Sequence, residues 1–338
     1  MAEGEARFGD TVEVRLAKAE LARRTAPETL PLAVERLSAD VEGFSPDDRV
    51  RLYEGLARYA RGSDGGRAAL ELWRKIAAIR KDSLRAWLTT AQLAGEAGDE
   101  GGLRTALAEV RRLEGPEGPL GDFVEATWTV GRLAQNPDLR KDETKLKAEL
   151  DDARTLLTRA GKQRKEWSAV PRALGILESL AGNVSAATEQ FLRAYELGDR
   201  SVEVVRALVR HHRAQGQPDR AAAVLREAEE RTPGVLAAEL GREAWQVALE
   251  NGRIDEAVAI TGQLAERSSD FHDRIVHGHV LYTKYRLLPE AERNGENGKR
   301  ILAQSTDLFR KVAEEAPQEP DAWIALAAHL HRTGDPDA

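Results

Sequence analysis

The apolar positions of this sequence do not follow the pattern of β-strands. No sustained run alternates Val, Ile or Thr with polar residues, as half-buried strands do. Long stretches rich in Ala, Leu, Glu and Arg, which are good helix formers, are instead interrupted by a glycine and a polar residue. In HHRAQGQPDRA (211–221) one helix is followed by Gly-Gln and then by Pro-Asp, which starts the next helix. The sequence therefore predicts an all-α protein whose helices are joined by short turns.

These interruptions recur at a nearly constant interval. Three glycines followed by a polar residue lie 34 and 36 residues apart, and two Gly-Asp pairs each follow a tryptophan by eleven residues. Around the tryptophans, RAWLTTAQLAGEAGD and DAWIALAAHLHRTGD are the same segment twice. The marks are Gly182-Asn183, Gly216-Gln217, Gly252-Arg253, Gly98-Asp99 with Trp87, and Gly334-Asp335 with Trp323. A fixed period of this length indicates a repeat protein.

The unit resembles the tetratricopeptide repeat, a 34-residue helix–turn–helix with small residues where its two helices cross. A large side chain at the crossing would push the helices apart. The matching positions are Tyr53, Leu56, Ala57, Ala69, Trp73 and Ile76; Leu174-Gly175, Ala187, Phe191 and Ala194; Val205, Leu208, His212, Ala221, Leu225, Ala228 and Pro233; and Ile275, Gly278, Tyr282, Phe309, Val312 and Pro317. The resemblance implies an all-α, right-handed α-α superhelix of about seven helix pairs that ends inside a repeat.

The resemblance covers about residues 47–338. Residues 1–46 carry no repeat marks, and we expect them to form two helices that cap the array or make up a degenerate repeat. Two repeats exceed the period, and we place the insertions near 134–150 and 288–300. Because both segments are charged, each insertion is predicted to be a longer second helix and a solvated loop.

The register of one repeat stays open. Either Leu240-Gly241 or Ala244-Trp245 fits the Leu-Gly positions of the repeat that precedes Gly252. The two choices differ by four residues, which is about one helical turn, so both present the same face of the helix.

Composition limits the chemistry of the chain. The sequence has no Cys, which excludes disulfides, thiolate metal ligands and cysteine nucleophiles. The first twenty residues lack the continuous apolar core of a signal peptide, and no stretch approaches the ~20 apolar residues of a membrane span. We therefore expect a cytoplasmic protein. A net charge of −7 argues against nucleic acid as a partner.

In the family that this repeat resembles, the first helices line a concave groove that binds peptides. The helix expected at 200–213 has a net charge of +3, and its arginines recur at i, i+4 and i+7 on one face. Five arginines share this face by their place in the repeat: Arg206, Arg210 and Arg213, with Arg172 one repeat earlier and Arg242 one repeat later. Because Arg pairs bidentately with carboxylates, we predict that they bind an acidic peptide or a C-terminal carboxylate, between about 168 and 250.

Two alternatives bear on this groove. The first is that the arginines form a solvated face and pair with neighbouring Glu residues. The second is the carboxylate clamp of some members of the family, which uses Lys and Asn on successive first helices. Ala173 and Ala207 stand at the Asn places, so we do not expect the clamp.

The sequence predicts no catalytic, metal or cofactor site. There is no G-x-G-x-x-G after a strand, no Walker loop and no G-x-S-x-G elbow. The clustered histidines stand at i, i+2, which places their side chains on nearly opposite faces of a helix, whereas chelation from one helix needs i, i+4. These histidines are His277 with His279, and His329 with His331.

These patterns predict a non-catalytic scaffold that binds a peptide or a partner protein. The alternative is a regulatory or targeting domain of a larger enzyme whose catalytic part follows residue 338, since fold alone does not decide function. The last helix, PDAWIALAAHLHR, is expected to expose Trp323, Leu326 and Leu330. We therefore expect either a fragment of a longer chain or a partner at this end, including a second copy bound end to end.

Overall fold

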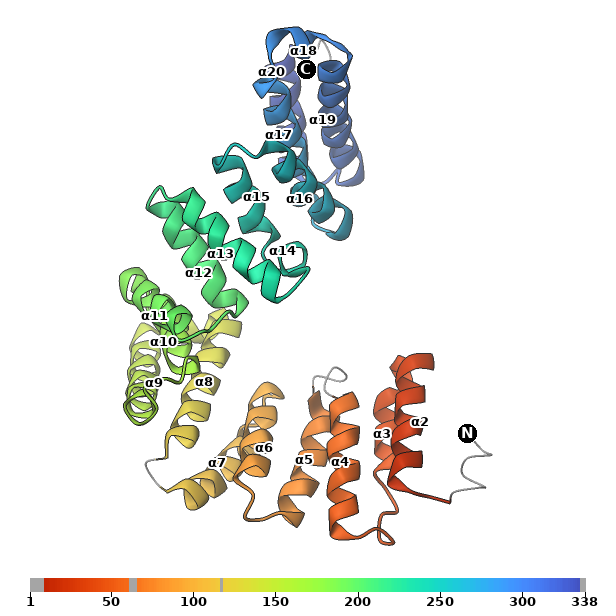
Figure 1. Ribbon diagram of the computed structural model, residues 1–338, viewed down its shortest axis with the longest axis vertical. Coiled ribbons are helices and arrows are strands. Elements are labelled where there is room, and N and C mark those ends of the chain that lie inside the picture. Colours follow the sequence, from red (N-terminus) through yellow and green to blue (C-terminus); the bar gives the residue numbers. More distant parts are fainter. Residues whose placement is uncertain (1–8, 61–65, 116–117, 335–338) are drawn as a thin grey trace. The chain divides into compact units, whose positions relative to one another are not determined.

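The computed structural model describes residues 9–60, 66–115 and 118–334, and every regular element in those ranges is a helix (Figure 1). The prediction of an all-α fold is therefore confirmed. The chain divides into two compact units, residues 1–187 and 188–338, and each is described here by itself. The first eight residues of the predicted N-terminal segment, and Asp335 beside Gly334, lie outside the described residues.

The first unit is a series of helix pairs. Its elements are α2 (Val12–Thr25), the 3₁₀ turn η1 (Pro27–Thr29), α3 (Leu30–Leu37), α4 (Pro46–Ala60), α5 (Arg67–Ile79), α6 (Leu84–Glu96), α7 (Glu100–Glu114), α8 (Pro119–Gln135), the 3₁₀ turn η3 (Pro137–Arg140), α9 (Glu143–Gln163) and α10 (Ala169–Leu180). Helices α4 and α5, α6 and α7, and α8 and α9 pack in pairs, and α6 also packs on α8, the first helix of the next pair. This neighbour-to-neighbour packing is what defines a helical-repeat protein.

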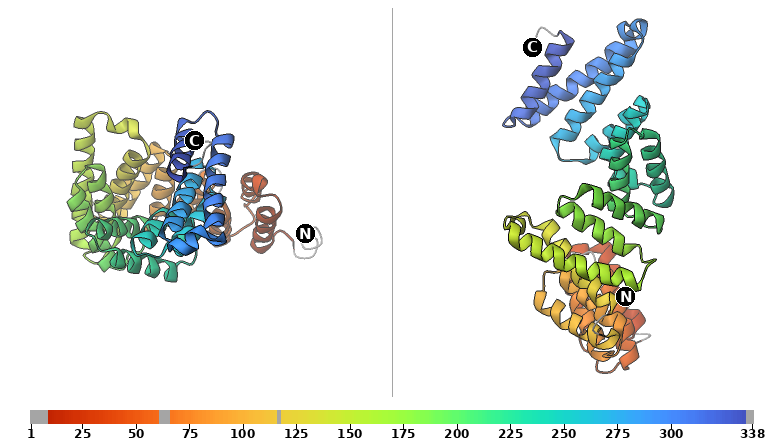
Figure 2. Two further views of the ribbon diagram at one scale, coloured as in Figure 1. Left: turned by 90° about the horizontal axis from the view of Figure 1, so that it is seen from above. Right: turned by 90° about the vertical axis from the view of Figure 1, so that its left-hand side faces the viewer.

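The second unit continues the same architecture. The division between the units falls inside α11 (Val184–Glu196). After it come α12 (Val202–Ala214), α13 (Pro218–Arg231), α14 (Val235–Ala238), α15 (Gly241–Glu250), α16 (Ile254–Arg267), α17 (Phe271–Leu287), α18 (Glu290–Asn294), α19 (Glu296–Glu315) and α20 (Pro320–Thr333). The pairs are α12 with α13, α15 with α16 and α17 with α19, and α20 packs on both helices of the last pair (Figure 2, blue).

The glycines that mark the period lie in the turn after each first helix. Gly216 has φ +66°, its amide donates to the Arg213 carbonyl at 2.9 Å, and the next amide, of Gln217, donates to the His212 carbonyl at 2.9 Å. This is the Schellman arrangement, which satisfies the last carbonyls of a helix and requires a left-handed residue. The same pair of bonds recurs at Gly98, Gly182 and Gly252. Backbone geometry therefore fixes where each of these first helices ends.

Small residues let the two helices of a pair approach closely. A Cβ atom at Gly278 of α17 would lie 2.9 Å from the ring of Phe309 on α19, which is too close for a real contact. Phe309 is fully buried, and the hydroxyl of Ser305, one turn earlier on α19, donates to the Gly278 carbonyl at 2.9 Å. The predicted small and aromatic positions of this repeat therefore meet across the helix crossing.

The two tryptophan segments fold alike. Trp87 donates from Nε1 to the Lys81 carbonyl at 2.9 Å, and Trp323 donates to the Pro317 carbonyl, again six residues earlier, at 3.1 Å. Trp323 is exposed, as predicted, and so is its neighbour Ile324. The predictions for Leu326 and Leu330 were wrong: Leu326 is half-buried and Leu330 is buried, because both pack against the preceding helix pair.

The structure settles the open register. Leu174 and Leu208 each lie eight residues before their turn glycines, and eight residues before Gly252 is Ala244, so Ala244-Trp245 occupy the Leu-Gly positions. The first helix of this repeat is short because α14 and α15 are separate. Gly241, at the start of α15, is crowded, since a Cβ there would meet the Leu264 side chain at 2.8 Å.

The segments predicted to hold insertions contain long helices. Residues 134–150 include η3 and the start of α9, which is 21 residues long. Residues 288–300 include the short α18 and the start of α19, which is 20 residues long. In both cases the added length follows the first helix of a pair.

The N-terminal helices are fastened to the first repeat. The buried Arg15 of α2 donates to the carbonyl of Leu37, the last residue of α3, at 3.0 Å and to that of Asp40 at 2.9 Å, and it pairs with Asp10 at 2.5 Å. Leu16 packs so tightly on Gly55 of α4 that a Cβ at Gly55 would lie 2.5 Å from it. None of the helices in the described ranges has the length and apolar character needed to cross a lipid bilayer.

Candidate ligand-binding face

Three of the predicted arginines lie on one side of α12. Val204, Val205, Leu208 and Val209 of this helix are buried, and the arginines stand on its more exposed side. We call Arg206, Arg210 and Arg213, together with Arg242 of α15, the arginine face. All four reach a carboxylate on the first helix of the next repeat.

Arg206 and Arg210 converge on one buried acid. Nε of Arg206 and Nη2 of Arg210 each lie 3.1 Å from Oε1 of Glu243, whose side chain is only 7% exposed. Arg206 also donates from Nη2 to the Glu239 carbonyl at 2.7 Å. A carboxylate removed from water needs such partners, because its desolvation is costly unless charge and hydrogen bonds compensate. Glu243 therefore fixes the two guanidinium groups in place.

Arg213 is held more completely than the other arginines. It donates from Nε and Nη2 to Glu250 at distances of 2.6 to 3.0 Å and from Nη1 to Gln246. These bonds to Glu250 raise the pKa of Arg213 above its ordinary value. With its side chain only 25% exposed, Arg213 joins α12 to α15 and has few donors left for a ligand.

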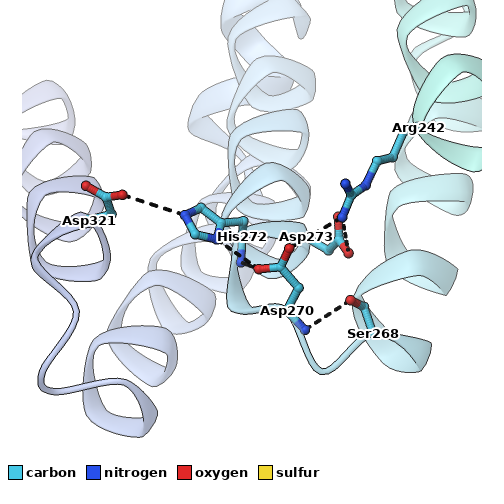
Figure 3. Close-up of polar contacts among 6 residues, drawn as sticks. All are labelled: Arg242, Ser268, Asp270, His272, Asp273 and Asp321. Carbon is cyan, nitrogen blue, oxygen red and sulfur yellow. Dashed lines mark hydrogen bonds and ion pairs between the residues drawn. The ribbon is translucent and has the colours of Figure 1, made fainter. Parts of the chain in front are cut away.

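Arg242 repeats the pattern one helix pair later. Its Nη2 lies 3.2 Å from Asp273 and 3.4 Å from Asp270, at the start of α17 (Figure 3). Asp270 also caps α17, since it accepts the His272 amide at 3.0 Å and the His272 ring Nδ1 at 2.8 Å. The hydrogen bond from the His272 backbone amide, and then the one from the His272 ring, lower the pKa of Asp270.

His272 connects this start of α17 to α20. In Figure 3 its ring lies between Asp270 and Asp321, with Nε2 3.6 Å from the Asp321 carboxylate. The hydrogen bond to Asp270, together with the charges of both carboxylates, raises the pKa of His272. The imidazolium form therefore bridges two acidic residues on two packed helices.

A hollow of about 780 Å³ opens beside the arginine face, within the second unit. Its lining carries four arginines and three carboxylates: Arg206, Arg210, Arg242 and Arg267, with Glu239, Glu243 and Asp273. The volume is that of a site able to take several residues of a peptide. The charge of the lining is mixed, because most of its arginines form an ion pair with an acid that also lines the hollow.

The structure brings together four of the five predicted arginines. Arg172 lies on α10 in the first unit, so it is not part of the described face. The expected helix 200–213 was also wrong at its start. Arg200 precedes α12, its Nε is 2.8 Å from Glu227 on α13, and it does not belong to the arginine face.

The sequence analysis named no particular acid on this face, but its alternative interpretation expected pairing with neighbouring Glu residues, and all four arginines do have an acid partner. Glu243 follows Arg210 by 33 residues and Arg206 by 37, which is about one period. An acid one period after an arginine lies on the neighbouring first helix, so this spacing was the available signal. Arg267, at the end of α16, carried no such signal because it lies on a second helix.

The first unit has its own hollow, of about 400 Å³, between α6 and α8. Trp128, Gln92 and Gln135 line it, and a Cβ at Gly95 would lie 2.9 Å from the indole of Trp128. The guanidinium of Arg132 lies over the same indole at 5.1 Å and pairs with Glu149 at 2.5 Å. The sequence prediction did not include this hollow.

The histidines singled out in the sequence are mostly packing residues. His329 is buried, with Nε2 2.9 Å from the Thr306 hydroxyl, and His277 lies 2.9 Å from the Thr261 hydroxyl. Burial lowers the pKa of His277. In the described ranges no three His, Cys, Asp or Glu side chains are grouped as a metal ion would need.

The helix pairs, the Schellman turns at a fixed period and the packing of successive first helices define an all-α helical-repeat protein with tetratricopeptide-like units. Neither a family model nor a curated protein matches the chain.

Solved structures with a similar arrangement include three proteins. The structure of YrrB, described as a tetratricopeptide protein with an unusual peptide-binding site, is 15% identical, with 63% of this chain and 98% of that chain covered and a TM-score of 0.42. PilW, a type IV pilus biogenesis factor, is 12% identical; the match covers 76% of this chain and 93% of that chain, with a TM-score of 0.38. The MamA protein is 13% identical; the match covers 56% of this chain and 95% of that chain, with a TM-score of 0.35. The assignment of the fold rests on the helix pairs themselves.

Proposed function

We propose that this protein is a non-catalytic interaction scaffold and that the arginine face of its second unit binds an acidic segment of a partner protein. The observation that carries the proposal is the state of Arg210 and Arg242. Both are held at their Nη2 atoms by a mostly buried carboxylate, while their side chains remain 67% and 65% exposed.

A guanidinium group has five N–H donors in a planar fork. In the described structure Arg210 engages only Nη2, with Glu243, and Arg242 engages only Nη2, with Asp270 and Asp273. The remaining donors of both arginines face the hollow or solvent and can form bidentate bonds to a further carboxylate. The buried acids orient the arginines in advance, which reduces the side-chain entropy lost on binding.

The mixed charge of the face also favours a particular kind of ligand. The lining carboxylates repel a uniformly anionic polymer, whereas spaced acidic side chains can each meet one arginine. A peptide with acidic residues separated by neutral ones fits this arrangement better than nucleic acid, whose backbone charge is continuous.

The experiment measures fluorescence anisotropy of a labelled peptide that alternates Glu with Ser, and of its Gln counterpart. Arg210→Gln is the informative variant, because Arg206 still pairs with Glu243 and the helix packing is kept. We expect the variant to weaken binding of the Glu peptide about tenfold and to leave the Gln peptide unchanged, as loss of one charge-assisted contact predicts.

A matched control is Arg226→Gln, which removes one exposed arginine from α13, outside the face. Equal weakening by both variants would show that only net charge matters and would refute the site. Reversal of charge at both Arg206 and Arg210 is a poorer test, since two new carboxylates beside the buried Glu243 would disturb the fold.

A further inference from the structure

A second hollow in the same unit has a different character from the arginine face. It has a volume of about 350 Å³ and lies between α17 and α20, with no lining residue in common with the hollow beside the arginine face. Its lining is His279, Tyr282, Thr283, Arg286, Leu287 and Arg332. Among these described residues there are two arginines and a histidine but no carboxylate.

The two arginines of this hollow differ from those of the arginine face. Within the described residues, no Asp or Glu side chain lies within ion-pair distance of the guanidinium of Arg286 or Arg332. In the arginine face, by contrast, Arg210 and Arg242 each have an acid at 3.1 to 3.2 Å.

His279 lies close enough to Arg332 for the positive charge of that arginine to affect its protonation. Its ring lies edge-on to Phe309, with centroids 4.9 Å apart, so it is backed by the core of the last helix pair. Burial, and then the charge of Arg332, lower its pKa below the ordinary value. The positive charge of Arg332 thus disfavours a second cation on the neighbouring ring, and an anion between them would relieve this repulsion.

Hydroxyl groups complete the polar lining. Tyr282 donates to the Arg332 carbonyl over a long 3.4 Å, a weak bond that a ligand oxygen at normal distance could replace. The ring of Tyr282 packs edge-on against the buried His329, with centroids 5.2 Å apart, so its position is fixed by the core. The Thr283 hydroxyl already donates to the His279 carbonyl at 2.9 Å and offers its lone pairs only.

We propose that the hollow between α17 and α20 binds an oxyanion, the carboxylate or phosphate group of a ligand, between Arg286 and Arg332, with Tyr282 as an additional donor. Arginine suits planar and tetrahedral oxyanions because its fork donates two parallel bonds. A volume of about 350 Å³ is larger than one phosphate needs, so the group can arrive on a larger molecule. The inference does not depend on the arginine face.

Isothermal titration calorimetry with inorganic phosphate at low ionic strength tests the proposal on the full chain. We expect one saturable site, weakened at least tenfold in the Arg286→Gln/Arg332→Gln double variant. Both side chains are exposed, so the variant should keep the wild-type circular dichroism spectrum. A matched pair, Arg67→Gln/Arg226→Gln, removes the same charge from exposed positions outside the hollow and should change the affinity less than twofold.

Further titrations distinguish the source of the anion. A Glu-containing peptide that displaces phosphate, and whose binding is weakened by Arg286→Gln/Arg332→Gln in an Arg210→Gln background, indicates a protein segment. Phosphate that binds more tightly than the peptide indicates a small phosphorylated ligand. The absence of saturable binding of any of these anions to the wild type, or equal weakening by both double variants, would overturn the proposal. Arg210→Gln should leave phosphate affinity unchanged, which keeps this test separate from that of the arginine face.

Discussion

Substitution of the turn glycines tests the physical origin of the repeat. Gly216 has φ +66°, and a Cβ added there would meet no atom within 4 Å, so Gly216→Ala has no steric clash with its surroundings. The cost is conformational: an L-residue in the left-handed region loses about 1–2 kcal/mol. Ala also restricts the unfolded chain more than Gly does, which offsets about 0.4–1 kcal/mol of this cost. We expect a net destabilisation of about 1 kcal/mol.

Two companion variants isolate this cause. Gly216→Asn adds a larger side chain, but Asn tolerates the left-handed region, so we expect it to cost less than the Ala variant. Gly131→Ala, inside α8, also meets no atom within 4 Å, but its backbone is helical. There the substitution should stabilise the first unit by about 0.5–1 kcal/mol, because Ala is the better helix former.

Urea unfolding followed by circular dichroism measures all three variants. A slope of about 2 kcal/mol per molar, ordinary for a unit of this size, turns 1 kcal/mol into a shift of about 0.5 M in the midpoint of the affected unit. Hydrogen exchange of the α12 and α13 amides then shows where stability is lost. If Gly216→Ala were neutral, or Gly216→Asn were the more destabilising, the end of α12 would not depend on a left-handed residue at position 216.

Two further predictions concern the acids beside the arginines. Glu243→Gln should destabilise the second unit by about 1–3 kcal/mol, because two guanidinium groups lose a mostly buried charged partner. Glu239→Gln should be neutral, because Arg206 bonds only to the backbone carbonyl of Glu239. Thermal unfolding of the two variants measures the difference. His272 should titrate above the ordinary value of about 6.5 in an NMR pH series and return toward it in Asp270→Asn. Because its folded pKa is raised, its contribution to stability is full below about pH 6.5 and is lost as pH rises through the folded pKa; a normal titration in the wild type would contradict this.

Local chemistry made the helix pairs predictable. A glycine followed by a polar residue ends a helix because few other residues adopt the left-handed turn, and this requirement is independent of the rest of the fold. The same holds for the small positions, since Gly278 must admit Phe309 wherever the pair lies. Backbone constraints of this kind leave a trace at each repeat, and a recurring trace can be read from one chain.

Helix ends and exposure were less predictable. The open register before Gly252 depended on where α15 begins: the helix starts at Gly241, so Leu240 precedes it and Ala244-Trp245 lie within it. Leu330 was assigned to the exposed face and is buried, because the face of α20 that meets the last helix pair is set by the crossing geometry. The sequence pattern of one helix does not determine the angle at which the neighbouring helix packs against it.

For this protein the sequence by itself determined the all-α class, the period of its turns and the alignment of Arg206, Arg210 and Arg213 on one side of α12, because each follows from interactions within a few residues. Only the tertiary structure decided which carboxylate each arginine meets and which arginines keep free donors. It also placed Arg286 and Arg332, which are 46 residues apart in the sequence and have no acid partner among the described residues, around one hollow. Coulombic pairing depends on distances between helices, and those distances are set by how side chains pack across the helix crossings.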